Sequence, residues 1–354
     1  MGFQVKVLSP ALAFAALLLA ASLGPPRPAA SAGPAASPTP LPYAIYFPYV
    51  ARGNVSAALA KPPAGSTGIS YVNYYRATAY LPPVAENATW SQGDWLHARY
   101  ATKNDVLQHS EDPSNPWYTT DGDAAARASN QIGSWDTAAS DEWAVDTWMQ
   151  AAFHAVGILD PALLQVGYGS YREINGGLQL AAGLDVIRGL GAVPPSVELP
   201  VRWPGNEITV PLTRHILEAP DPLTSCPGYT VPAGLPVLLI MGGGDPPPSV
   251  GSHSFSDSSG ALEHCLFDGT TYVNPDSALQ SLGRSILRAR NAIVLVPRAP
   301  LTPGGSYTAS INVNGHDYTW SFHIAGGAVS VEAGAPAATD SSVAGAGMLL
   351  APAP

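Results

Sequence analysis

The sequence predicts an α+β chain in which a region of helices and a hairpin is followed by an all-β sandwich. Apolar residues recur at helical spacing between 69 and 153. Strand-like segments at 165–171 and 178–187 follow, and Asn175-Gly-Gly177 between them is a turn signal. From about Val193 onward, short strand candidates are separated by Pro and Gly, which is typical of a β-sandwich.

The composition supports folded domains and limits the partners. The chain has 354 residues, of which 46% are apolar and only 12% are charged. This is room for two ordinary domains, with enough apolar side chains for their cores. The net charge of −10 argues against nucleic acid and against anionic lipid as the main partner, because an acidic surface attracts neither.

The N-terminus is predicted to be a signal peptide over residues 1–32. Lys6 precedes an apolar run from Ala11 to Leu23, and Ala30-Ser31-Ala32 offers the small residues of a cleavage site. The run is short for a transmembrane helix, so no integral membrane span is expected after processing. We therefore expect a secreted protein, extracellular or at the cell surface. An uncleaved membrane anchor is the alternative.

Low-complexity segments flank two expected domains. Residues 33–65 are rich in Pro and Ala and are predicted to be a linker. Residues 326–354 are again Gly, Ala, Ser and Pro without a periodic apolar face, and are predicted to be a disordered tail. Between them we expect one domain over residues 66–190 and a β-sandwich domain over residues 193–325.

Three helices are predicted in the first domain. The first ends before Pro82-Pro83, the second spans about 91–107, and the third spans about 140–153. Ser91 and Ser140 are the predicted N-caps, because a serine hydroxyl can accept a hydrogen bond from the first turn of a helix.

The second domain is predicted from its hairpins. Its best strands are 292–297 and the pair 307–313 and 318–324, and Asn314-Gly315 joins that pair with a strong hairpin signal. Residues 277–290 are predicted to be an inserted helix.

The two cysteines, Cys226 and Cys265, are predicted to form a disulfide. An even pair in an exported protein favours one bridge over two free thiols. Closing a loop of about forty residues contributes roughly 3–4 kcal/mol on the chain-entropy estimate. A metal role for them is not expected, because neither belongs to a CxxC motif.

His109 and His154 are the candidate functional residues of the first domain. Each follows or ends a predicted helix, and the two can meet only through the fold. Each alone is also explained as a hydrogen-bonded ring at a helix end, where the dipole favours imidazolium. Carboxylates such as Glu111 and Asp141 lie near them in sequence, so a polar cleft is one interpretation. The spacing of His97 and His109 is not that of an HExxH zinc site.

Four motifs occur in order along residues 66–190, and together they carry a family resemblance. They are Asn73-Tyr-Tyr-Arg76 with Leu81-Pro82, Trp95-Leu-His-Ala-Arg-Tyr100 leading to His109, Trp148-Met149 with His154, Ile158-Leu159 and Pro161, and Gly167-Tyr-Gly169. In this order they resemble the CAP superfamily of cysteine-rich secretory, antigen 5 and pathogenesis-related 1 proteins, in its bacterial SCP-like extracellular branch. The resemblance implies an α-β-α sandwich in which His109 and His154 face each other across a central cavity.

The departures from the family pattern concern the metal. Members with a complete site add two glutamates to the two histidines and can hold a divalent ion, commonly zinc. Here Ser129 stands in the place of one glutamate, and Ala151 in the place of the other. Glu111 could compensate in part. The resemblance therefore implies binding residues His109, Glu111, Ser129 and His154, and leaves zinc at His109 and His154 open, because affinity falls with each lost anionic ligand.

The end of the second domain resembles the immunoglobulin-like β-sandwich that follows some bacterial CAP domains. The similar segment is 292–324, with L-x-P-G-x-x-Y at 301–307 and Y-x-W-x-F at 318–322. Trp320 and Phe322 are expected to fill the core of that sandwich rather than a ligand groove.

Three functional hypotheses follow. The first is a secreted CAP protein that binds a small apolar or glycan ligand, or an extracellular protein, with no catalytic residue assigned. The second is a metal-dependent hydrolase that uses His109 and His154. The third is a structural or adhesive surface protein with a vestigial CAP site. No G-x-S-x-G elbow, P-loop or dinucleotide fingerprint occurs, so binding is expected rather than catalysis.

Overall fold

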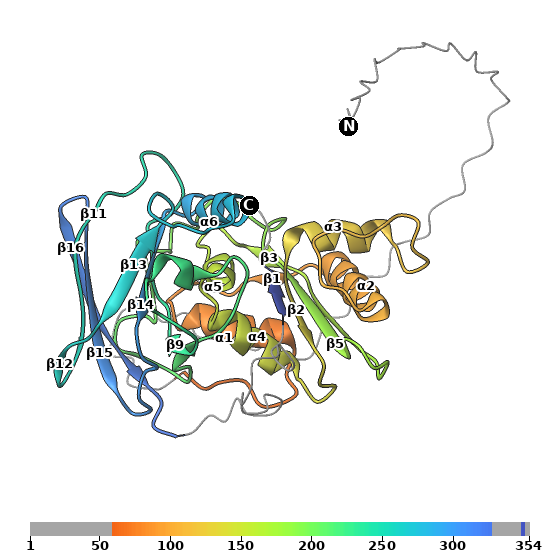
Figure 1. The fold of residues 1–354 in the computed structure, drawn as a ribbon, viewed down its shortest axis with the longest axis horizontal. Helices are drawn as coiled ribbons and strands as arrows, with labels where there is room; N and C mark the ends of the chain where they lie inside the picture. Colours follow the sequence, from red (N-terminus) through yellow and green to blue (C-terminus); the bar gives the residue numbers. More distant parts are fainter. Residues whose placement is uncertain (1–58, 328–347, 351–354) are drawn as a thin grey trace, which may run out of the picture. The chain divides into compact units, whose positions relative to one another are not determined.

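A computed structural model describes residues 59–327 and 348–350 of the chain (Figure 1). The predicted signal peptide lies outside the described residues, as do most of the predicted linker and tail. None of the helices in these two ranges is long and apolar enough to cross a membrane.

The first part of the chain alternates short helices and strands. Its elements are α1 (Gly68–Ala77), β1 (Ala85–Glu86), α2 (Ala88–Asn104), α3 (Thr120–Ala128), β2 (Ser129–Ser134), α4 (Asp141–Met149), α5 (Ala152–Ile158), β3 (Gln165–Val166), β4 (Tyr168–Arg172) and β5 (Leu180–Asp185). Three of these strands and β17 (Met348–Leu350) form an antiparallel sheet in the order β17-β2-β5-β4. Strands β1 and β3 form a separate parallel pair.

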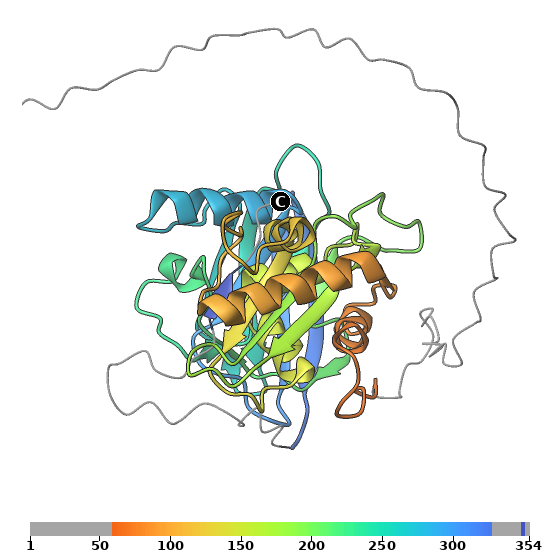
Figure 2. The same cartoon turned by 90° about the vertical axis from the view of Figure 1, so that its right-hand side faces the viewer.

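Strand β4 shows that helices cover both faces of this sheet. Gly169 faces α2, where an added Cβ would lie 2.1 Å from the backbone nitrogen of Trp95. Its neighbour Tyr168 contacts Trp148 of α4 on the other side, with ring centroids 6.3 Å apart. Neighbouring residues of a strand point to opposite faces, so α2 and α4 lie on opposite sides of the sheet. Figure 2 shows α2 crossing one face. The glycines of Gly167-Tyr-Gly169 let α2 approach closely.

The Asn73-Tyr-Tyr-Arg76 motif anchors α1. The Asn73 side chain donates to the Val84 carbonyl at 3.2 Å and accepts from the Val84 amide at 2.8 Å. Arg76 is fully buried, and burial lowers the pKa of its guanidinium to about 10, so it stays charged at neutral pH. It donates to the backbone carbonyls of Pro82, Ile158, Asp160 and Leu163. The motif therefore ties α1 to the chain that follows α5.

Helix α2 begins earlier than the sequence predicted. Its N-cap is Asn87, whose side-chain oxygen accepts from the backbone amides of Thr89 and Trp90. The predicted cap, Ser91, instead accepts from the Tyr168 amide of β4 at 3.1 Å. Asn and Ser are equally good N-caps, and the tertiary contact to β4 uses the serine.

The third predicted helix is two helices. Ser140 caps α4 as predicted, accepting from the Trp143 amide at 3.0 Å. The helix then ends, because Ala151 has an extended backbone with φ −108° and ψ 116°. Helix α5 starts after it, so His154 lies in the first turn of α5 and not at the end of α4. Helix α3 was not predicted.

The second part of the chain is mostly strand. Its elements are β6 (Val201–Trp203), β7 (Ile208–Val210), β8 (Arg214–His215), η1 (Pro222–Ser225), β9 (Ala233–Gly234), β10 (Val237–Ile240), β11 (Val250–Asp257), β12 (Gly260–Ala261), β13 (His264–Asp268), α6 (Ser277–Arg288), β14 (Ala292–Pro297), β15 (Ser306–Val313) and β16 (His316–Ile324). They form sheets in the orders β13-β14-β10-β6 and β12-β11-β15-β16-β7, and a β8-β9 pair.

Several predictions for this part are confirmed. The hairpin of β15 and β16 turns at Asn314 and Gly315, which both have positive φ (54° and 83°), as the favoured two-residue hairpin turn requires. Helix α6 is present. Cys226 and Cys265 form the predicted disulfide across 39 positions of sequence. Trp320 and Phe322 are buried in the core, as expected.

One hydrophobic core runs through both parts. The cluster of buried residues includes Trp148 and Phe153 from the first part and Trp203 and Tyr272 from the second. The ring of Phe153 lies edge-on to that of Tyr272, with centroids 5.0 Å apart. The indole nitrogen of Trp203 donates to the Thr78 hydroxyl at 3.0 Å. Packing is therefore continuous across the predicted boundary near residue 190.

Candidate functional site

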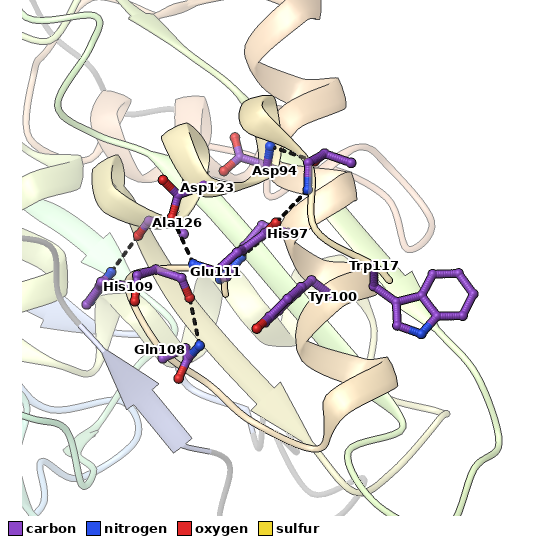
Figure 3. Close-up of polar contacts among 12 residues, drawn as sticks. Asp94, His97, Tyr100, Gln108, His109, Glu111, Trp117, Asp123 and Ala126 are labelled. Carbon is purple, nitrogen blue, oxygen red and sulfur yellow. Dashed lines mark hydrogen bonds and ion pairs between the residues drawn. The ribbon is translucent and has the colours of Figure 1, made fainter. Parts of the chain in front are cut away.

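His109 lies half-buried in a polar layer between α2, α3 and β2 (Figure 3). Its Nδ1 lies 2.7 Å from the Ala126 carbonyl, and because a carbonyl only accepts, Nδ1 carries the ring proton. The side-chain amide of Gln131 also donates to that carbonyl, at 2.9 Å, and lies 3.0 Å from the same ring nitrogen. The end of α3 and strand β2 therefore set the orientation of the ring.

Glu111 contacts His97 in the same layer. One carboxylate oxygen lies 3.0 Å from Nδ1 of His97, and the other accepts from the Thr119 amide at 2.9 Å. The Glu111 amide in turn donates to Asp123 at 2.8 Å. Glu111 is therefore placed to orient His97. The other ring nitrogen of His97 is buried and has no hydrogen-bond partner among the residues that the structure describes.

Ser129 faces a buried acid. Its hydroxyl donates to Asp94 of α2 at 2.5 Å. Burial raises the pKa of Asp94 well above its ordinary value of 3.8, so this carboxyl tends to keep its proton. A glutamate in place of Ser129 would add a second carboxyl beside the first. The neutral hydroxyl of Ser129, where the resemblance places a glutamate, is therefore consistent with the buried acid that α2 supplies there.

His154 is fully buried and paired with a carboxylate from the second part of the chain. Its Nδ1 lies 2.8 Å from a carboxylate oxygen of Glu218, and both side chains are 0% exposed. The Phe153 amide lies 3.1 and 3.2 Å from the two oxygens of Glu218. Nδ1 therefore donates to Glu218, and Nε2 is buried without a partner among the described residues. Glu218 was not predicted from the sequence, because no local pattern links it to a histidine 64 positions away.

A second buried imidazole lies at the same junction. His215 of β8 donates from Nδ1 to the Gln150 carbonyl at 3.0 Å. Burial lowers the pKa of His215, and the charge of Glu218 opposes that shift in part. The junction of α4 and α5 therefore meets the second part of the chain through two imidazoles and one carboxylate.

Strand β2 approaches His109 and His154 from opposite faces of the sheet. Gln131 contacts the ring of His109, whereas its neighbour Asn130 donates to the His154 backbone carbonyl at 3.1 Å. Adjacent strand residues point to opposite faces. The facing pair of histidines stays a prediction.

Zinc at His109 and His154 stays a prediction. Within the described ranges, no group of three or more His, Cys, Asp or Glu could hold a metal ion. The carboxylates of Glu111 and Glu218 contact Nδ1 atoms of His97 and His154. Ser129 and Ala151 bring no carboxylate. No chemical step is therefore assigned to a metal here.

A comparison with protein families identifies the first part of the chain. Residues 69–179 match the model of CAP, the Cysteine-rich secretory protein family. The match covers α1 to β4, with His109, Glu111, Ser129 and His154, and it excludes Glu218. No curated protein and no solved structure matches the chain at a significant level. Residues 69–179 therefore match a CAP domain, and we refer to them as the CAP domain.

Proposed function

We propose that the chain is an extracellular binding protein whose CAP domain takes an extended peptide along the outer edge of β2. The observation that carries this proposal is the pairing of β17, in which Leu349 is opposite Ile132 and Leu350 is opposite Gln131 in an antiparallel register. Peptides that add a strand to a sheet gain affinity from main-chain hydrogen bonds. CAP membership supports an extracellular ligand-binding role.

The edge of β2 has the properties that strand addition needs. Without β17, β2 would be the last strand of its sheet, and an edge strand presents unpaired amide and carbonyl groups. Gln131, which contacts His109, is opposite Leu350. An imidazole and a side-chain amide therefore lie near one end of the paired segment, where they can select among peptides.

The sequence of β17 supports its role as the segment that occupies the edge of β2. Met348-Leu349-Leu350 is the only run of three large apolar residues after residue 326. Pro352 and Pro354 follow it, and proline has no amide proton to donate to a strand. The segment that can pair with β2 is therefore short, and prolines follow it.

Secretion is part of the proposal. The pattern of residues 1–32 is that of a signal peptide. The disulfide between Cys226 and Cys265 supports the same compartment, because disulfides persist in oxidising environments.

We also infer that the second part is an immunoglobulin-like module. Its sheets run β6-β10-β14-β13 and β7-β16-β15-β11-β12. Lettered in chain order, these orders correspond to the ABED and GFC sheets of that fold. Such modules commonly serve at cell surfaces, which supports an extracellular role.

Peptide binding to a truncated chain tests the main proposal. Residues 33–327 and residues 33–354 are each titrated into a fluorescent peptide of residues 343–354, and anisotropy reports binding. We expect the truncated chain to bind and the full chain to bind at least ~10-fold more weakly, because a tethered strand competes at about millimolar effective concentration. A peptide with Leu349→Pro is the control and should not bind. Lack of binding to the truncated chain up to ~1 mM would contradict the proposal.

A structural or adhesive role is the second candidate, and the core shared by both parts favours it. The two candidates differ in how they depend on the layer around His109. A His109→Ala, Gln131→Ala double variant should weaken peptide binding by the truncated chain, whereas attachment to a surface should not change.

A further inference from the structure

Two histidines of the second part meet between its two sheets. His253 lies on β11 of the five-stranded sheet, and His264 lies on β13 of the four-stranded sheet. Nδ1 of His253 is 2.9 Å from Nε2 of His264, and the ring centroids are 5.0 Å apart. Both residues lie outside the CAP domain and far in sequence from the edge of β2, so neither has a part in the proposed peptide binding.

The backbone fixes which nitrogen of His264 faces its neighbour. Nδ1 of His264 lies 2.8 Å from the Leu262 carbonyl, so Nδ1 carries the proton and Nε2 carries a lone pair. Histidines that bind metals usually donate their other ring N–H to a carbonyl or carboxylate, which orients the ring and raises its basicity. His264 has this arrangement, with its lone pair directed at His253.

The spacing of the two nitrogens suits one shared ion. An imidazole nitrogen binds zinc at about 2.0–2.1 Å, so two nitrogens in adjacent coordination positions are roughly 2.9–3.4 Å apart for angles from 90° to tetrahedral. The observed 2.9 Å is within this range. Imidazole is a ligand that zinc, copper and nickel all accept.

The two rings are also accessible to a cation. His253 is exposed and His264 is half-buried, so an ion can reach them from solvent and keep water ligands.

We propose that His253 and His264 bind a divalent late transition-metal ion, with zinc as the reference ion, between β11 and β13. No third His, Cys, Asp or Glu in the described ranges completes the set. The site is therefore open, with water or a donor from a partner in the remaining positions. A bound ion would link the two sheets beside Cys265, whose disulfide already fixes β13 to the segment after η1.

Zinc titration of residues 33–354 tests this proposal. With zinc alone in a non-chelating buffer, calorimetry should show one ion per chain, and the melting temperature should rise because only the folded state holds both ligands together. His253→Ala and His264→Ala should each weaken zinc binding at least ~10-fold. His316→Ala changes an exposed histidine of the same domain and is the matched control.

Two further variants separate the possible explanations. His253→Gln keeps a hydrogen-bonding side chain toward His264 but removes the imidazole, so it should fold normally and lose the zinc effect. A His109→Ala, His154→Ala double variant should keep the effect of zinc on the melting temperature. This result would distinguish the proposed site from any metal site in the CAP domain. Zinc binding that is unchanged in His253→Gln, or no binding by the unaltered chain, would overturn the proposal. A direct hydrogen bond between the rings would then explain their spacing.

Discussion

His154 of the CAP domain donates to Glu218 of the second part across 2.8 Å, and neither side chain is exposed. Glu218 also faces the Phe153 amide. The polar partner of a CAP histidine therefore comes from outside the residues that match the family model. This pair joins the two parts at the same place as the aromatic contact between Phe153 and Tyr272.

Removing the Glu218 carboxylate should strongly destabilise the fold. Glu218→Ala leaves the ring N–H of His154 and the Phe153 amide buried without acceptors, so we expect a loss of about 3–5 kcal/mol in the free energy of unfolding, measured by urea denaturation. Glu218→Gln keeps an acceptor oxygen and should lose about half as much. Glu263→Ala removes an exposed partner of Arg298 and should cost under ~1 kcal/mol. Equal losses in Glu218→Ala and Glu263→Ala would show that the buried pair contributes no more to the free energy of unfolding than an exposed ion pair.

The close approach of α2 to the sheet should make Gly169 intolerant of a side chain. A Cβ at this position would lie 2.1 Å from the Trp95 backbone, which cannot move without shifting α2. We expect Gly169→Ala to lower the free energy of unfolding by about 3 kcal/mol or more, measured by thermal or urea denaturation. Gly327→Ala meets no atom within 4 Å and serves as the control. A stable Gly169→Ala chain would mean that α2 can move away from the sheet.

His215 should make stability depend on pH on the acidic side of neutrality. Its folded pKa is lowered below the ordinary 6.5, first by burial, with Glu218 and Asp221 opposing. The unfolded state then binds more protons, so this contribution is complete above pH 6.5 and is lost as the pH falls through the folded pKa.

The matched variant for that prediction is His215→Asn, which can still donate to the Gln150 carbonyl but does not titrate. Stability measured by urea denaturation should fall less steeply in this variant than in the unaltered chain as the pH drops below 6.5. The same pH profile in both chains would rule out His215 as the source. Glu218 is present in both proteins, so the comparison isolates the change at His215.

Local signals predicted much of the fold. Ser140 as the cap of α4, the turn at Asn314-Gly315 and the pairing of Cys226 with Cys265 each depend on a few adjacent residues or on a simple count. The motifs of the CAP resemblance predicted the domain that the family model matches. Helix α3 was not predicted, because its run of alanines lacks the large apolar residues from which helical periodicity is recognised.

The candidate site was less predictable because its partners come from distant elements. Glu218 reaches His154 because β8 packs on the junction of α4 and α5. Glu111 was expected to act beside His109. Its side chain instead contacts His97 of α2. β17 lies within residues 326–354, whose composition predicts no regular structure, and its pairing depends on an edge that forms elsewhere in the chain.

The strand on the edge of β2 also gives the chain a way to respond to cleavage. Residues 328–347 connect the second part to β17 and contain mostly Gly, Ala, Ser and Val. A cut in this stretch would turn a tethered contact into one between separate molecules, and dilution outside the cell would then empty it. Under the proposed function, an extracellular protease would thereby expose the peptide-binding edge permanently, without changing any residue that forms it.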